Sequence, residues 1–123
     1  MKIIGIIPAR FESTRFPGKP LVEIDGKSVI QRVVEQCQKA KSLQEIVVAT
    51  DDARIVDHVE SFGAKVIMTK KSHESGTDRC AEVMDELKAW EDYDFAINIQ
   101  GDEPFIEPKL IDELASSLDF KIE

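Results

Sequence analysis

Basic residues gather in one short segment of an otherwise acidic chain. The sequence holds 16 Lys and Arg residues against 24 Asp and Glu residues, which gives a net charge of -8. From Arg10 to Lys19, however, three basic residues stand against one acid, and small or hydroxyl-bearing residues such as Ser13, Thr14 and Gly18 accompany them. Arginine and lysine bind phosphate oxygens, and small residues let backbone N–H groups approach an anion. The segment is therefore a candidate polyphosphate cradle, with a solvated loop of scattered charges as the alternative.

Hydroxyl and charged side chains recur at residues 73–79, which read His-Glu-Ser-Gly-Thr-Asp-Arg. Ser75 and Thr77 flank Gly76 at the point where a helix is predicted to begin. A helix N-terminus offers unpaired N–H groups and the positive end of a dipole, which suit an anionic or polar ligand. Ser75 with Asp78 three residues later also matches a plain capping box. The two interpretations are compatible, so this segment is a second candidate ligand contact.

Two acids follow an apolar stretch late in the chain, in the run Gln100-Gly101-Asp102-Glu103-Pro104. Magnesium takes oxygen ligands and is usually held by one or two carboxylates plus substrate phosphates. Gly101 has no side chain, so a nucleotide is expected to approach the backbone there. The run is a candidate metal site centred on Asp102, and an ordinary turn is the alternative.

Apolar periodicity predicts the elements that must position these segments. Apolar, β-branched runs predict buried strands at Ile3–Pro8, Glu45–Thr50 and Lys65–Met68 and at residues 93–99. Four helical stripes lie between and after them, and all four are interpreted as core faces. Their members are Val29, Ile30, Val33, Val34 and Cys37; Ile55, Val56, Val59 and Phe62; Cys80, Met84 and Leu87; and Leu110, Ile111, Leu114 and Leu118.

End signals support these helices. Ser28 is expected to cap the first helix, and the pair Asp51-Asp52 to cap the second rather than to bind a metal. Gly63 is expected to close the second helix, and Pro108 to open the fourth. Strands that alternate with helices predict an α/β fold with a parallel sheet, in which ligands bind beyond the carboxyl ends of the strands.

Each candidate segment follows a predicted strand or begins the next helix, so one crevice can collect all three. The connection from residue 9 to residue 27 is much longer than the roughly 2–6 residues typical of such loops, and long loops are usually functional.

The three segments together resemble the Kdo cytidylyltransferases (CMP-Kdo synthetases, 3-deoxy-manno-octulosonate cytidylyltransferases). The matching strings are A-R-x-x-S-T-R-[LF]-P-G-K-P, H-x-S-G-T-[DE]-R and Q-G-D-E-P, in that order. The resemblance implies a three-layer Rossmann-like nucleotidyltransferase (glycosyltransferase-A-like) domain with a mostly parallel sheet. It also implies transfer of CMP from CTP to the anomeric hydroxyl of Kdo, with release of pyrophosphate, for lipopolysaccharide biosynthesis.

The resemblance also assigns roles to individual residues. The phosphate-binding residues it implies are Arg10, Ser13, Thr14, Arg15 and Lys19. Those it places against the cytidine part are Ser75, Gly76, Thr77 and Arg79, whereas Gln100 and Gly101 face the nucleotide or the sugar. The resemblance further implies that Asp102 binds the catalytic Mg²⁺ and that Arg10, Lys19 and Asp102 carry the catalysis.

Members of this family are about twice as long as this chain. Residues 1–123 are therefore expected to form the CTP-binding part, with a second metal-binding aspartate, most of the sugar pocket and the homodimer contacts in the other half. The chain alone is expected to bind CTP without turnover. A cytidylyltransferase for another sugar acid, such as sialic acid, and a non-catalytic nucleotide-binding module are the competing interpretations.

Composition excludes several other classes of protein. A net charge of -8 argues against nonspecific binding of nucleic acid or an anionic membrane. Two separated cysteines, Cys37 and Cys80, form neither a disulfide framework nor a zinc site and are expected to be reduced, half-buried thiols. The first apolar run is too short for a signal peptide or a membrane span, so a cytoplasmic location is expected. Neither a P-loop nor a G-x-G-x-x-G dinucleotide motif is present.

Overall fold

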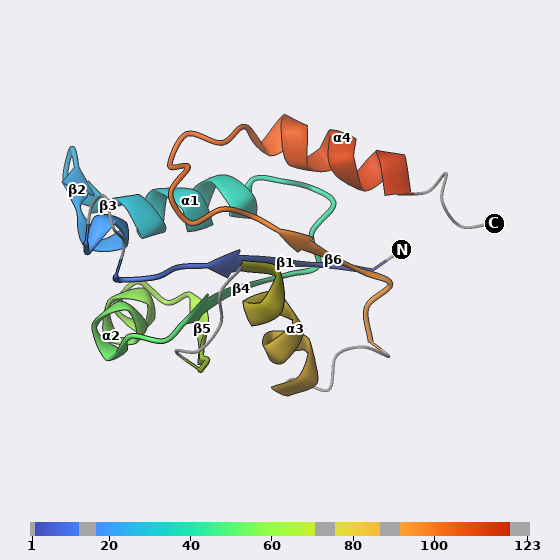
Figure 1. The fold of residues 1–123 in the computed structure, drawn as a ribbon. Helices are drawn as coiled ribbons and strands as arrows, with labels where there is room; N and C mark the ends of the chain where they lie inside the picture. The colour runs from blue at the N-terminus through green and yellow to red at the C-terminus, as the bar shows by residue number, and fades with distance from the viewer. Residues whose placement is uncertain (1, 13–16, 71–75, 87–91, 119–123) are drawn as a thin grey trace.

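The computed structural model describes residues 2–12, 17–70, 76–86 and 92–118. Within these ranges a four-stranded sheet has the order β5-β4-β1-β6, and all of its strand pairs are parallel. Its strands are β1 (Ile3–Pro8), β4 (Glu45–Thr50), β5 (Lys65–Met68) and β6 (Phe95–Asn98). Helices lie on both sides of this sheet (Figure 1). The predicted parallel α/β architecture is confirmed.

Strand β1 is central, and its side chains supply both faces of the core. All six of its residues are buried. Ile3 and Ile7 belong to one apolar cluster, whereas Ile4 and Ile6 belong to the other. This division follows from the two-residue period of a strand, whose successive side chains point to opposite faces. A fully apolar run is therefore the correct signal for a strand that is covered on both sides.

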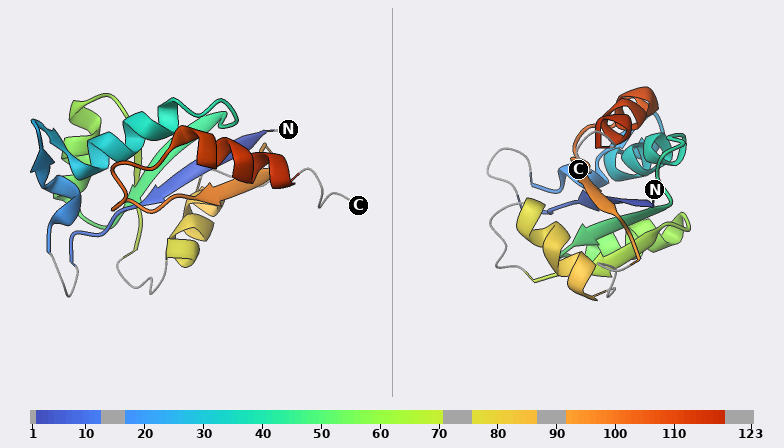
Figure 2. Two further views of the ribbon diagram at one scale, coloured as in Figure 1. Left: turned by 90° about the horizontal axis from the view of Figure 1, so that it is seen from above. Right: turned by 90° about the vertical axis from the view of Figure 1, so that its right-hand side faces the viewer.

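The helices divide between these two faces. Helix α1 (Val29–Gln38), helix α2 (Ala53–Ser61) and helix α4 (Pro108–Leu118) place residues in the cluster around Ile3 and Ile7. Helix α3 (Gly76–Glu86) packs in the other cluster through Cys80, Val83 and Met84. Two further views show α4 beside α1, with α3 on the other side of the sheet (Figure 2). None of the described helices is long and apolar enough to cross a membrane.

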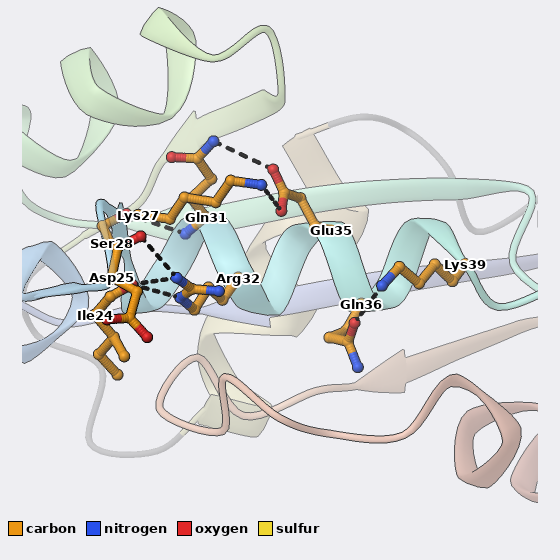
Figure 3. Close-up of polar contacts among 9 residues, drawn as sticks. All are labelled: Ile24, Asp25, Lys27, Ser28, Gln31, Arg32, Glu35, Gln36 and Lys39. Atoms are coloured by element: carbon orange, nitrogen blue, oxygen red, sulfur yellow. Dashed lines mark hydrogen bonds and ion pairs between the residues drawn. The ribbon is translucent and has the colours of Figure 1, made fainter.

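Helix α1 shows how the sequence determines one of these elements. Ser28 caps it, because the Ser28 hydroxyl accepts a hydrogen bond of 3.1 Å from the Gln31 backbone N–H. The predicted apolar stripe is buried along its whole length. The polar side carries local contacts, in which Lys27 and Gln31 donate to Glu35 at 2.9 and 3.2 Å (Figure 3).

Helix α2 begins at the predicted cap, but only one of the two aspartates fills that position. The Asp52 carboxylate accepts a hydrogen bond of 2.8 Å from the Arg54 backbone N–H. Gly63 follows the helix with a φ of 81°, a left-handed conformation that favours glycine. Asp51 has a different partner, described with the site below.

The long connection after β1 is more structured than the sequence analysis expected. It contains a 3-10 helix, η1 (Lys19–Leu21), and a hairpin of β2 (Glu23–Ile24) and β3 (Lys27–Ser28). Asp25 and Gly26 turn the hairpin with φ values of 50° and 86°, as a two-residue hairpin turn requires. The Arg32 side chain holds the hairpin against α1 by donating to the Ile24 carbonyl (Figure 3). The expectation of a single long loop over residues 9–27 is therefore wrong.

Two expectations near the end of the chain also need correction. The fourth strand spans Phe95–Asn98, which is shorter than the predicted residues 93–99. Helix α4 does begin at Pro108, but only part of its apolar stripe is covered. Ile111 is buried, whereas Leu110 and Leu114 are 57% and 50% exposed. Apolar periodicity identifies the helix, but it does not determine how wide a face the neighbouring elements cover. The side chains of Leu87 and Leu118 lie outside the described part of the chain.

Candidate functional site

A cavity of about 750 Å³ opens beyond the carboxyl ends of β1 and β6. This is the place where parallel α/β sheets bind ligands. The wall combines the end of β1, the connection that follows it, the segment after β6 and one side chain of α3. The lining residues are Pro8, Ala9, Arg10, Glu12, Pro17, Lys19, Pro20, Arg79, Gln100, Gly101 and Asp102.

The basic connection reaches the cavity through Arg10 and Lys19. Arg10 directly follows the end of β1 and is exposed. Lys19 begins η1, and its Nζ lies 3.7 Å from an Asp102 carboxylate oxygen. Both side chains of this ion pair are largely accessible, so the pair leaves the lysine able to meet an anion. Ser13, Thr14 and Arg15 lie outside the described residues.

Phe11 holds the connection after β1 in place through contacts with Gly18 and with Arg54 of α2. The Gly18 backbone N–H donates to the Phe11 carbonyl at 2.6 Å, and Gly18 adopts a φ of 75°. A Cβ on Gly18 would come within 3.1 Å of the Phe11 ring, so glycine suits both the conformation and the contact. The Arg54 guanidinium lies 3.3 Å from the centroid of the same ring. These contacts set the direction in which the chain enters η1 and so place Lys19.

The segment after β6 meets the end of β1 closely. Gly101 is buried, and a Cβ there would lie 2.6 Å from the Pro8 carbonyl oxygen. Glycine is thus required by the backbone of β1, a reason different from the predicted approach of a nucleotide. Gln100 and Asp102 flank this contact and are both exposed at the cavity. The run therefore presents an amide and a carboxylate from a fixed backbone.

Arg79 is a cavity residue from helix α3, and it is completely buried. Its Nη1 donates to the Thr69 hydroxyl and to the Lys70 carbonyl, the latter at 3.2 Å. Its Nη2 lies 3.4 Å from the Asp51 carboxylate. Sequence reasoning missed Asp51 and Thr69 as the partners of Arg79, although each directly follows a predicted strand. Ser75 lies outside the described residues, and only the backbone of Gly76 and Thr77 is described, in the first turn of α3.

The structure thus brings together Arg10, Lys19, Arg79, Gln100, Gly101 and Asp102 from segments far apart in the sequence. In the described part of the chain, no group of three His, Cys, Asp or Glu residues could hold a metal ion. Asp102 alone fits Mg²⁺ only if most of the other ligands are phosphate oxygens or water, which is the usual way that proteins bind this ion with a nucleotide.

The two cysteines take no part in this chemistry. Both are free and buried. Burial raises the pKa of the Cys37 thiol to about 12 and that of the Cys80 thiol to about 11. Because the thiolate is the nucleophilic form, neither residue is reactive near neutral pH.

Comparison with known proteins places this arrangement among related sequences. The cytidylyltransferase family model matches residues 4–121. The 3-deoxy-manno-octulosonate cytidylyltransferases of Geobacter metallireducens and Parabacteroides distasonis are 52% and 57% identical to the chain, over 96% and 90% of its length. The match covers 45% and 43% of those two proteins, so the chain spans slightly less than half their length.

A solved structure agrees with the sequence relatives. The structure of CMP:2-keto-3-deoxy-manno-octonic acid synthetase complexed with CTP matches with a TM-score of 0.90 and 45% identity. The match covers 97% of this chain and 48% of that one.

Proposed function

Because the chain belongs to the cytidylyltransferase family, we propose that it forms the CTP-binding part of an enzyme that makes CMP-Kdo from CTP and Kdo. The observation that carries the proposal is the cavity at the strand ends, where Arg10, Lys19 and Arg79 meet Asp102 in a chain of net charge -8. The names of the relatives support Kdo as the sugar acid, and the CTP complex of the similar structure supports the nucleotide.

The proposed reaction is a direct displacement at the α-phosphate of CTP. The anomeric hydroxyl of Kdo attacks the α-phosphorus and loses its proton, the bond from that phosphorus to the bridging oxygen breaks, and pyrophosphate leaves. Positioning and charge stabilisation supply most of the catalysis in reactions of this kind. Arg10 and Lys19 are the cations that would bind the phosphates and stabilise the negative charge that develops on the leaving group.

We also propose that Asp102 holds a Mg²⁺ ion together with phosphate oxygens of CTP. The exposed carboxylate beside Lys19 supports this, since both groups line the same cavity. When bound, the ion would neutralise phosphate charge and orient the triphosphate.

The remaining length of the relatives is proposed to supply what this chain does not. We assign to it a second metal-binding carboxylate, most of the sugar pocket and the contacts of a homodimer, in a cytoplasmic enzyme of lipopolysaccharide biosynthesis. The chain alone should consequently bind CTP weakly and release no pyrophosphate.

A titration and an assay test these statements separately. Calorimetric titration of the purified chain with CTP in the millimolar range should show binding, and incubation with CTP, Kdo and Mg²⁺ should release no pyrophosphate. Absence of CTP binding would contradict the nucleotide assignment. Pyrophosphate release at a rate near that of a full-length relative, such as the Geobacter metallireducens protein, would show that the other half is not needed for turnover.

A further inference from the structure

Arg79 is an unusual member of the cavity wall, because its charge is buried rather than exposed. Its exposed fraction is 0%, whereas Arg10, at the same cavity, is exposed. A buried charge is costly unless it is paired and hydrogen-bonded. The contacts of Arg79 should therefore explain why the chain places a guanidinium there.

Those contacts give hydrogen-bond partners to the two terminal nitrogens of the guanidinium and leave its Nε–H without one in the described part of the chain. Thr69, the Lys70 carbonyl and Asp51 receive hydrogen bonds from the two terminal nitrogens. The Nε atom is also buried, yet it has no hydrogen-bond partner among the residues that the structure describes. A buried N–H without a partner costs about 1–3 kcal/mol. An acceptor from a ligand in the cavity would remove that cost.

The pairing with Asp51 determines which kind of acceptor suits this N–H. Asp51 already balances the charge of Arg79, so the free N–H offers a directed hydrogen bond with little net positive charge. Such a donor suits a carbonyl or ring nitrogen better than a phosphate. The phosphates have Arg10 and Lys19, which reach the cavity from the connection after β1.

We propose that Asp51 and Thr69 are positioning residues for nucleoside recognition, which hold the Arg79 guanidinium so that its Nε–H meets an acceptor on the base or ribose of CTP. The inference rests on the proposed function. The two residues come from neighbouring strand ends, since Asp51 follows β4, Thr69 follows β5, and the Thr69 N–H donates to the Thr50 carbonyl at 2.7 Å. The sheet itself thus fixes the orientation of the arginine.

The adjacent aspartate provides a matched control. Asp52 caps α2 and binds the Arg54 guanidinium at 2.7 Å, whereas Asp51 lies 3.4 Å from the Arg79 guanidinium. Asp51→Asn and Asp52→Asn therefore remove the same charge at neighbouring positions. Asparagine is as good an N-cap as aspartate, so Asp52→Asn should change stability little, whereas Asp51→Asn removes the charged partner of the buried arginine.

The experiment compares CTP with inorganic tripolyphosphate as ligands of the purified chain, by calorimetry. Asp51→Asn should weaken CTP binding about tenfold, the equivalent of one hydrogen bond to a well-placed partner, and leave tripolyphosphate binding unchanged. Asp52→Asn should leave the ratio of the two affinities as in the wild type. Thr69→Val should act in the same direction as Asp51→Asn, and Thr69→Ser, which keeps the hydroxyl, should restore CTP binding.

Several outcomes would overturn the inference. Equal weakening of CTP and tripolyphosphate by Asp51→Asn would indicate a merely structural role, and so would no change in either. If Asp51→Asn does not fold, as thermal denaturation would reveal, the Thr69 pair decides the question by the same ratio. Wild-type binding of tripolyphosphate without any preference for CTP would instead contradict the proposed function, and the inference with it.

Discussion

The cavity at the strand ends and the face between β6 and α4 are adjacent regions with opposite chemistry. Gln100 lines both of them. Two cations of the cavity wall have an acidic partner, since Lys19 pairs with Asp102 and Arg79 pairs with Asp51. The second region is a groove of about 490 Å³ with a mainly apolar wall. Its apolar lining residues are Ile97, Ile99, Ile106, Leu110, Ile111 and Leu114.

The difference shows that polar contacts position the side chains of the cavity, whereas apolar burial determines what the side chains near the groove contribute to stability. Polar groups in the cavity are positioned by contacts such as that of Gly101 with the Pro8 carbonyl and that of Lys19 with Asp102. The groove offers mainly apolar contact, and half-exposed leucines gain little of the roughly 25 cal/mol per Å² that full burial supplies. Substitutions in the cavity should therefore change ligand binding, and substitutions near the groove should change stability in proportion to burial.

The largest expected effect is on stability, and it compares a buried and an exposed residue of α4. Ile111→Ala should lower the free energy of unfolding by about 2–4 kcal/mol, because Ile111 is only 3% exposed. Leu110→Ala is the matched control, and it should cost less than about 0.5 kcal/mol because that side chain is largely in water. Urea denaturation of both variants measures the difference. Similar losses at the two positions would mean that Leu110 is covered in solution.

The next effect belongs to the cavity and concerns binding alone. Arg10→Ala and Lys19→Ala should each weaken CTP binding about 10–100-fold, since each removes a charged partner of the phosphates. Lys27→Ala serves as a control, because Lys27 pairs with Glu35 and does not line the cavity. Calorimetric titration with unchanged CTP affinity in both cavity variants would rule out the phosphate cradle.

A smaller effect tests the polar side of α4. The Asp112 carboxylate accepts hydrogen bonds from the Ser42 hydroxyl at 2.7 Å and from the backbone N–H groups of Ser42 and Lys41. The bond from the Ser42 hydroxyl is the main reason that the pKa of Asp112 lies below its ordinary value of 3.8. A lowered folded-state pKa means that the stabilisation is present above about pH 4 and is lost as the pH falls through the folded pKa.

Asp112→Asn should accordingly cost about 1 kcal/mol at pH 7 and progressively less below pH 4. Unfolding by urea at pH 7 and at pH 3 gives the comparison. Glu113→Gln, at the exposed neighbouring position, is the control. A cost that does not vary with pH would indicate that the carboxylate charge is irrelevant to this contact.

The smallest effect is a change in CTP affinity whose sign depends on whether Asp102 acts as the ion-pair partner of Lys19 or as a metal ligand. Without Mg²⁺, Asp102→Asn should strengthen CTP binding a few-fold, because it removes a negative charge and frees Lys19. With Mg²⁺ present, the same variant should bind CTP more weakly than the wild type, because the metal ligand is lost. Calorimetry in EDTA and in millimolar Mg²⁺ measures both. The same sign of change in the two buffers would argue against a metal at Asp102.

The elements that were predictable from the sequence are those that a short continuous stretch of residues specifies by itself. The bounds of β1, β4 and β5 follow from apolar runs, and the start of α1 follows from the hydroxyl of Ser28. The hairpin at Asp25-Gly26 was missed although the Asp-Gly pair is a known signal for such turns, because its strands are only two residues long and carry no alternating pattern.

The candidate site was predictable only where its residues lie within continuous segments. Arg10, Lys19 and Asp102 stand in such segments, and the structure brings them to one cavity. The pairing of Arg79 with Asp51 spans 28 residues, so no local pattern could reveal it. The exposure of Leu110 and Leu114 was likewise unpredictable, since it depends on the neighbours that the fold supplies to α4.

The central position of β1 has a consequence for how the chain folds during its synthesis. Strand β1 is made first, yet its partners are β4 and β6, and β6 ends about 90 residues after β1 does. At about 5–20 residues per second, a ribosome needs roughly 5–18 s to produce the second partner. Throughout that interval β1 is an apolar segment of the nascent chain with an unpaired edge, and such edges readily pair with other chains. Chaperone demand should therefore be set by the delay before β6 emerges rather than by the stability of the finished sheet.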